Sequence, residues 1–175
     1  QGAGTSLTLN ANADVQSTTG HVTLSAAQSI TLGAGVDVST GGGGTVDVLA
    51  GTGSFTMNAT ATVSTVNGDI RIAAGDDVLD QLVLGDVTAV NANVSLSTAG
   101  SVLDADATAG NNDGDADVTA NGLRVVAGKG FGLLAGNSLG QPVNAIETVV
   151  TTLSILVRGS DGVNLVEADA LVIGD

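Results

Sequence analysis

The residues with the clearest potential for chemistry are three aspartates at alternate positions, Asp113, Asp115 and Asp117. Two asparagines precede them, so the segment offers several of the hard oxygen ligands that calcium prefers. The similarity to an EF-hand loop is partial, because Arg124 stands where that loop needs a bidentate glutamate. These aspartates therefore predict a calcium site, and a solvated acidic loop is the alternative interpretation.

Two further carboxylates, Asp80 and Asp104, end the similar segments DVLD and SVLD. Alignment with the internal repeats described below places both in a column of apolar, inward-facing side chains that includes Met57. A carboxylate in such a column is costly to bury unless it is paired or bound to a metal. Either the chain turns here and both carboxylates face outward, or they form a functional pair.

Other catalytic groups are scarce. The chain has no cysteine and one histidine, His21, which excludes a cysteine–histidine metal cluster and leaves no base for a catalytic triad. It has no tryptophan or tyrosine on which a sugar could stack, and Phe55 and Phe131 both fall at inward positions. We therefore expect no enzymatic activity and no certain cofactor. A carbohydrate-binding or carbohydrate-active protein is an alternative.

Internal repeats of about 24 residues must position these groups. Residues Ser6–Gly20, Ser29–Gly43 and Ser54–Gly68 each contain a run in which apolar and polar residues alternate, which is typical of a half-buried strand. This run is predicted to continue at Val78, Val102, Phe131 and Val163. A shorter run recurs at Val22, Val46, Ile70, Val94 and Leu123, with a further copy expected at Ile155.

The fold predicted from these repeats is a right-handed parallel β-helix, or β-solenoid, with about 24 residues per coil and roughly six to seven coils. Equivalent residues on successive coils would lie about 4.8 Å apart. Asp47 and Arg71 would then share an outward column as an ion pair. Residues 1–175 are expected to form a single domain, as a segment of a longer chain or as a stacking fibre subunit.

Thr8, Thr31 and Thr56 form another predicted outward column, which makes an ice-binding surface a further alternative. The column is not predicted to extend beyond the third repeat.

The charge balance excludes some classes of partner. With 18 acidic and 4 basic residues, the formal net charge is −14, which argues against binding to nucleic acid or to anionic membrane surfaces. No apolar stretch approaches the roughly 20 residues that cross a membrane as a helix, so we expect no membrane insertion.

The repeat style resembles that of a known group of proteins. Segments such as HVTLSAAQSITLGAGVDVSTGGGGTVDVLAG are similar to the repeats of filamentous-haemagglutinin-like adhesins and other giant bacterial surface exoproteins, over about residues 5–105. The resemblance implies an extracellular or cell-surface structural protein that forms a stalk or filament and acts in adhesion. The partners expected are further copies of the chain, end to end or along a fibre, and host or environmental glycans or proteins.

The repeat pattern is broken at two places. Residues Ala107–Asn121 lengthen one repeat, and Leu139–Val150 forms a second insertion that contains the sole proline and is expected to be a short helix or a loose loop. We predict that any specific site lies at Asp104–Asp117 and Leu139–Val150.

Overall fold

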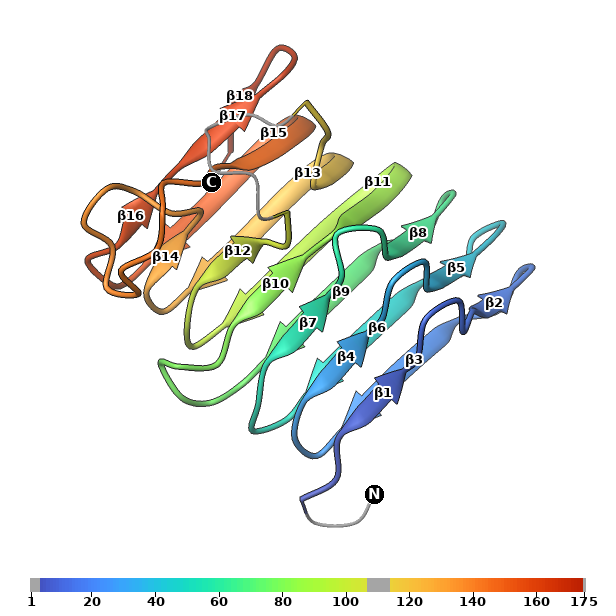
Figure 1. The fold of residues 1–175 in the computed structure, drawn as a ribbon. Helices are drawn as coiled ribbons and strands as arrows, with labels where there is room; N and C mark the ends of the chain where they lie inside the picture. The colour runs from blue at the N-terminus through green and yellow to red at the C-terminus, as the bar shows by residue number, and fades with distance from the viewer. Residues whose placement is uncertain (1–3, 107–113, 175) are drawn as a thin grey trace.

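The protein is all-β. A computed structural model describes residues 4–106 and 114–174, in which eighteen strands, most of them short, are linked by turns and loops. Strands from successive segments lie side by side, from the N-terminal end of the molecule to the C-terminal end (Figure 1). In the described part of the chain no helix is present that could span a membrane.

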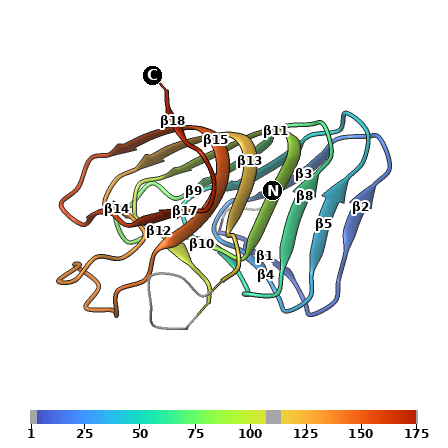
Figure 2. The same ribbon diagram turned by 90° about the horizontal axis from the view of Figure 1, so that it is seen from above.

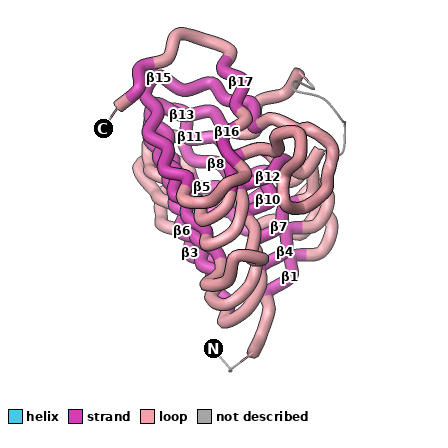
Figure 3. The backbone as a smooth tube through the Cα atoms, turned by 90° about the vertical axis from the view of Figure 1, so that its left-hand side faces the viewer, coloured by secondary structure: helices cyan, strands magenta, loops and turns pink. Residues whose placement is uncertain are grey.

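The first sheet contains seven parallel strands, each two or three residues long, and their spatial order follows the chain. Figure 3 shows these strands stacked in a row, with loops leading to the other sheet. The strands are β1 (Leu7–Leu9), β4 (Ile30–Leu32), β7 (Phe55–Met57), β10 (Leu82–Leu84), β12 (Val102–Asp104), β14 (Gly130–Phe131) and β16 (Gly162–Val163).

The second sheet contains eleven strands and is strongly curved (Figure 2). Three long strands, β11, β13 and β15, run through the curve, and β11 pairs with β8 near its start and with β9 near its end. The strands are β2 (Val15–Ser17), β3 (Val22–Ala26), β5 (Asp37–Thr40), β6 (Val46–Ala50), β8 (Thr62–Thr65), β9 (Ile70–Ala74), β11 (Asp86–Thr98), β13 (Val118–Ala127), β15 (Ile146–Val157), β17 (Leu165–Glu167) and β18 (Val172–Ile173).

The core lies between the two sheets and consists of the inward side chains of alternating strand positions. Phe55 and Phe131, the two aromatic residues, are fully buried, as the alternation predicted. Burial of a large apolar side chain contributes about 1.5–3 kcal/mol. Most core residues are valine, leucine, isoleucine or alanine, so the space between the sheets is filled by small side chains.

The predicted right-handed parallel β-helix of roughly six to seven coils is wrong. The structure divides its eighteen strands between parallel sheets of seven and eleven strands, without a regular series of 24-residue coils. One reason is that β11, β13 and β15 each join two runs that the sequence presents as separate. The other is that the turns between strands differ in length. The structure does confirm that the protein is all-β and that its sheets consist of parallel strands.

Within the sheets, the register of the early repeats is as predicted. Ile30 pairs with Leu7 on one side and with Phe55 on the other. The ion pair between Asp47 and Arg71 is also confirmed, with Arg71 Nη1 2.7 Å from Asp47 Oδ1. Because 53% and 45% of these side chains are exposed, the pair contributes only about 0–1 kcal/mol.

The predicted register is wrong at two later positions. Leu82, not Val78, pairs with Phe55, and Leu153, not Ile155, pairs with Leu123. The first shift arises from a turn in which Asp80 Oδ2 accepts hydrogen bonds from the backbone N–H groups of the two residues at positions 76 and 77. This turn leaves Val78 exposed and delays the start of β10.

The insertion predicted at Leu139–Val150 contains no helix: it is a loop as far as residue 145, and its last five residues belong to β15. An isolated antiparallel bridge between Leu133 and Asn144 closes a longer loop, which begins directly after β14 and includes the first part of this insertion. The buried side chain of Asn137 donates to the backbone carbonyls of residues 134 and 141, which fixes the loop's path.

The register shift at β10 predicts opposite effects for two apolar truncations. Leu82→Ala should lower the free energy of unfolding by about 2–5 kcal/mol, because Leu82 is fully buried and its removal leaves a cavity. Val78→Ala should change that free energy by no more than about 0.5 kcal/mol, because 54% of Val78 is exposed. Urea unfolding of both variants measures the difference, and equal losses would contradict the observed register.

Candidate functional site

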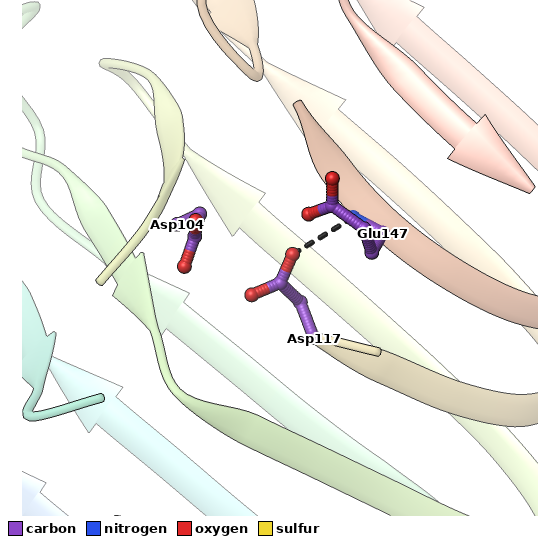
Figure 4. A group of neighbouring side chains, drawn as sticks. All are labelled: Asp104, Asp117 and Glu147. Carbon is purple, nitrogen blue, oxygen red and sulfur yellow. Dashed lines mark hydrogen bonds between the residues drawn. The ribbon is translucent and has the colours of Figure 1, made fainter. Parts of the chain in front are cut away.

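Three carboxylates from separate segments meet where the repeat pattern is broken. Asp104 ends β12, Asp117 immediately precedes β13, and Glu147 is the second residue of β15. One carboxylate oxygen of each lies within 4.8 Å of the others. Figure 4 shows the three side chains converging, and we refer to them as the carboxylate cluster.

Asp104 enters the cluster because of strand alternation. In β12, Val102 is buried in the core, so the residue two positions later faces the same side of the strand. Asp104 pairs in register with the fully buried Leu84. A carboxylate therefore replaces an apolar side chain at the edge of the core.

Asp117 and Glu147 belong to a different column. Val118, which follows Asp117, pairs with Val87 on β11 and with Thr148 on β15. The residues just before these three partners are therefore neighbours across the sheet. They are acidic in all three strands: Asp86, Asp117 and Glu147.

Burial and repulsion make the cluster electrostatically costly. Only 8% of Asp117 and 5% of Glu147 are exposed. Burial, followed by the negative charge of Asp104, raises the pKa of Asp117 to about 9, although a hydrogen bond from the backbone N–H of Glu147 (2.8 Å to Asp117 Oδ2) opposes the rise. At neutral pH, Asp117 therefore holds a proton unless a cation stabilises its charge.

Hydrogen bonds hold Asp104 in place. Its Oδ1 accepts the backbone N–H of Asp106 at 2.7 Å, and its Oδ2 accepts the side-chain amide of Asn144 at 2.8 Å. Because Asn144 belongs to the second insertion, this contact connects the two regions that the sequence singled out. That these irregular segments contain a functional site stays a prediction.

Two cavities flank the segment from Asp104 to Asp106. One has a volume of about 370 Å³ and is lined by Asp86, Asp115 and Asp117 together with these two aspartates. The other, of about 490 Å³, has a more apolar lining that includes Leu133 and, from the second insertion, Leu139 and Pro142. The carboxylate cluster is thus adjacent to space that is open to solvent on the acidic side.

The predicted calcium ligands are only partly brought together. Asp117 joins the carboxylate cluster, Asp115 lines the acidic cavity, and Asp113 lies outside the described residues. The suggested pairing of Asp80 with Asp104 is wrong, because Asp80 caps the turn before β10. The alternative, in which both carboxylates face outward, is also wrong for Asp104, which is half-buried against Asp117.

Glu147 was missed, although the sequence contains a signal for it. Asp-Val dipeptides at Asp14, Asp37, Asp86 and Asp117 each lie immediately before or at the start of a strand of the second sheet, while two others lie within β6 and in the turn before β10. Continued by one more strand, this series arrives at Glu147. The second insertion obscured the register, because the strand begins later than the regular spacing predicts.

The arrangement suits a hard divalent cation. Calcium takes oxygen ligands at about 2.3–2.6 Å, so two ligands on opposite sides of one ion lie about 5 Å apart. The oxygen atoms of the carboxylate cluster meet this limit. Among the residues that the structure describes, no other set of three acidic or histidine side chains does so. His21 is not close to such a group, and its Nδ1 lies 2.8 Å from Thr45 Oγ1 in a turn.

Comparisons with known proteins give no family for the chain, since no protein-family model, curated protein or solved structure matches it.

The raised pKa of Asp117 predicts that stability falls as pH rises. The folded state retains a proton that the unfolded state releases above a pKa of about 4, so the free energy of unfolding should decrease between about pH 4 and pH 9. Asp117→Asn removes this titration and keeps an acceptor for the N–H of Glu147. In EDTA, the variant should gain about 2 kcal/mol or more relative to the original protein between pH 5 and pH 8.

Asp115→Asn is the matched control. It removes one negative charge from an exposed residue that lies two positions before Asp117. Urea unfolding at each pH measures both variants. A pH dependence that is the same for Asp117→Asn and the original protein would contradict a buried, protonated Asp117.

Proposed function

We propose that the chain is a structural and adhesive segment of a bacterial surface protein, in which the stacked strands form a stalk that carries loops outward. The observation that supports this most is the continuity of pairing. Neighbouring segments are joined by parallel strands from Leu7 to Ile173, with the two ends of the described chain at opposite ends of the molecule. In such a scaffold, each added segment pairs with the previous one and makes the molecule longer.

The chemistry of the described residues agrees with a scaffold better than with an enzyme. Outward positions are mainly threonine, serine, asparagine and aspartate, and the sole histidine has a structural contact in a turn. The threonine column that suggested ice binding ends at Thr56, since Val83 is the next residue in register. The geometry therefore favours the structural role over the ice-binding alternative.

Surface location is tested with an antibody raised against the loop between Leu133 and Asn144. It should label intact cells of the organism that carries the gene, because a stalk at the cell surface exposes this loop. An antibody against a cytoplasmic protein is the control for lysis. Labelling that appears only after cells are broken open would overturn the proposal.

A second function is favoured by the buried carboxylate cluster. We propose that it binds a divalent cation, with calcium as the best candidate, and that the ion fastens the two insertions to β12, β13 and β15. Without an ion, Asp117 must hold a proton, because three charged carboxylates this close together, two of them buried, would repel one another. A divalent cation would replace the proton on Asp117 and remove that repulsion.

Calcium should stabilise the folded protein. At a concentration about 100 times the dissociation constant, a ligand adds about 2.7 kcal/mol, which corresponds to a rise of about 5 °C or more in the melting temperature of a chain of this size. Thermal unfolding in millimolar calcium and in EDTA measures the rise. Asp117→Asn and Glu147→Gln should each abolish most of it.

Asp115→Asn again serves as the control and should keep most of the calcium effect. Identical melting temperatures in calcium and in EDTA would exclude a cation of this type at the cluster. If calcium still raises the melting temperature of Asp117→Asn and Glu147→Gln, the ion binds at another place.

A further inference from the structure

The few basic residues of this acidic chain are not scattered. Arg71 and Arg124 lie in one column of the second sheet, separated by Ser95 on β11 and followed by Ser154 on β15. The outward positions beside this column carry one carboxylate, Asp47 on β6. A second carboxylate, Asp69, lies just before β9, and its Oδ1 accepts hydrogen bonds from the backbone and side-chain N–H groups of Asn93. Half of the chain's four cationic side chains therefore share this column of a molecule with a net charge of −14.

A groove of about 680 Å³ runs across these strands. Its polar lining consists largely of short side chains that can donate and accept hydrogen bonds. Gly122 on β13 pairs with Asn93 on β11 and with Thr152 on β15. Because glycine has no side chain, the groove is deeper at this position. The groove is lined by Arg71, Asn93, Ser95, Arg124, Thr152 and Ser154, among others.

Arg124 is the cation best placed to hold a ligand. Arg71 already forms an ion pair with Asp47, the one ion pair found among the described residues. The neighbours of Arg124 in register are Ser95 and Ser154, whose hydroxyl groups leave its charge uncompensated. A guanidinium group binds a carboxylate through two parallel hydrogen bonds, and this geometry gives both strength and orientation.

The spacing in the groove suits an extended ligand. Arg71 and Arg124 are two strand separations apart, which is about 9–10 Å. The hydroxyl and amide groups between and beside them lie at single-strand intervals. A partner that lay across the strands would meet Arg71 on β9, Ser95 on β11 and Arg124 on β13 in turn.

We propose that this groove binds an acidic glycan, an extended oligosaccharide that carries carboxylate groups. Arg124 pairs with a carboxylate, and the serine, threonine and asparagine side chains bind sugar hydroxyls. The apolar part of the groove lining is aliphatic, with Val126 and Leu156, and includes none of the aromatic side chains that dominate protein interfaces, while its cations are too few for nucleic acid. The inference rests on the adhesive role proposed above and gives that role a ligand class.

The remaining negative charge opposes such a ligand only weakly at physiological ionic strength. The Debye length there is about 8 Å, so carboxylates beyond the groove are largely screened. Asp69 lines the groove itself, but its Oδ1 already accepts two hydrogen bonds from Asn93. Because the site contains two arginines and no exposed aromatic platform, binding by one copy should be weak and sensitive to salt.

The test uses a short oligogalacturonate as the probe and its neutral methyl ester as the matched control ligand. The intact protein should bind the acidic oligomer in a saturable, salt-sensitive manner by calorimetry or NMR titration, and it should bind the ester about tenfold more weakly or not at all. Arg124→Gln should weaken binding of the acidic oligomer about tenfold. Lys129→Gln removes the same charge from a turn outside the groove and should leave binding unchanged.

Thermal unfolding of both variants verifies that they are folded. The proposal is overturned if the acidic oligomer does not bind, if its ester binds equally well, or if Arg124→Gln binds normally. It is also overturned if the arginines instead drive salt-sensitive self-association, which sedimentation of the protein alone would reveal. Antibody labelling of intact cells does not depend on glycan binding, so failure of this inference is distinguishable from failure of the proposed surface location.

Discussion

Parallel hydrogen bonding between successive segments is the constraint on which the rest of the structure depends. A strand such as β7 (Phe55–Met57) is too short to be stable alone, and its backbone groups pair with the segments before and after it. Because side chains alternate, a slip of one residue would turn Phe55 outward and Thr56 into the core. The buried columns and the backbone register therefore stabilise each other.

This constraint also explains why acidic groups are buried in a protein with so few cations. Asp104 faces inward because Val102 must, and Asp117 and Glu147 are neighbours because the residues after them pair in register. The carboxylate cluster is thus a product of strand register rather than of a dedicated binding loop. Its burial makes the protonation of Asp117, or the presence of a cation, part of the stability of this region.

Sequence reasoning succeeded where turns keep a constant length and failed where they do not. The pairings of Ile30 and of Asp47 follow directly from alternation and spacing, because the intervening turns are nearly equal. Leu82 was missed because hydrogen bonds to Asp80 create a longer turn, which no periodic pattern encodes. Periodicity also cannot tell two short strands from one long, curved strand, which is why uniform coils were wrongly expected. Asp117 was proposed as a ligand from its own local motif, and that role stays a prediction, whereas the position of Glu147 beside it required knowledge of pairing across an insertion.

The antiparallel bridge between Leu133 and Asn144 has a consequence for how such a chain can diversify. The bridge brings the two ends of the loop together, while β14 and β15 on either side keep their parallel partners. The entropy of closing a loop rises only slowly with its length. Residues inserted at an exposed position of this loop, away from the buried Asn137, would therefore cost little thermodynamically, and sequence drift there would change the molecular surface while the stacked strands kept their pairing.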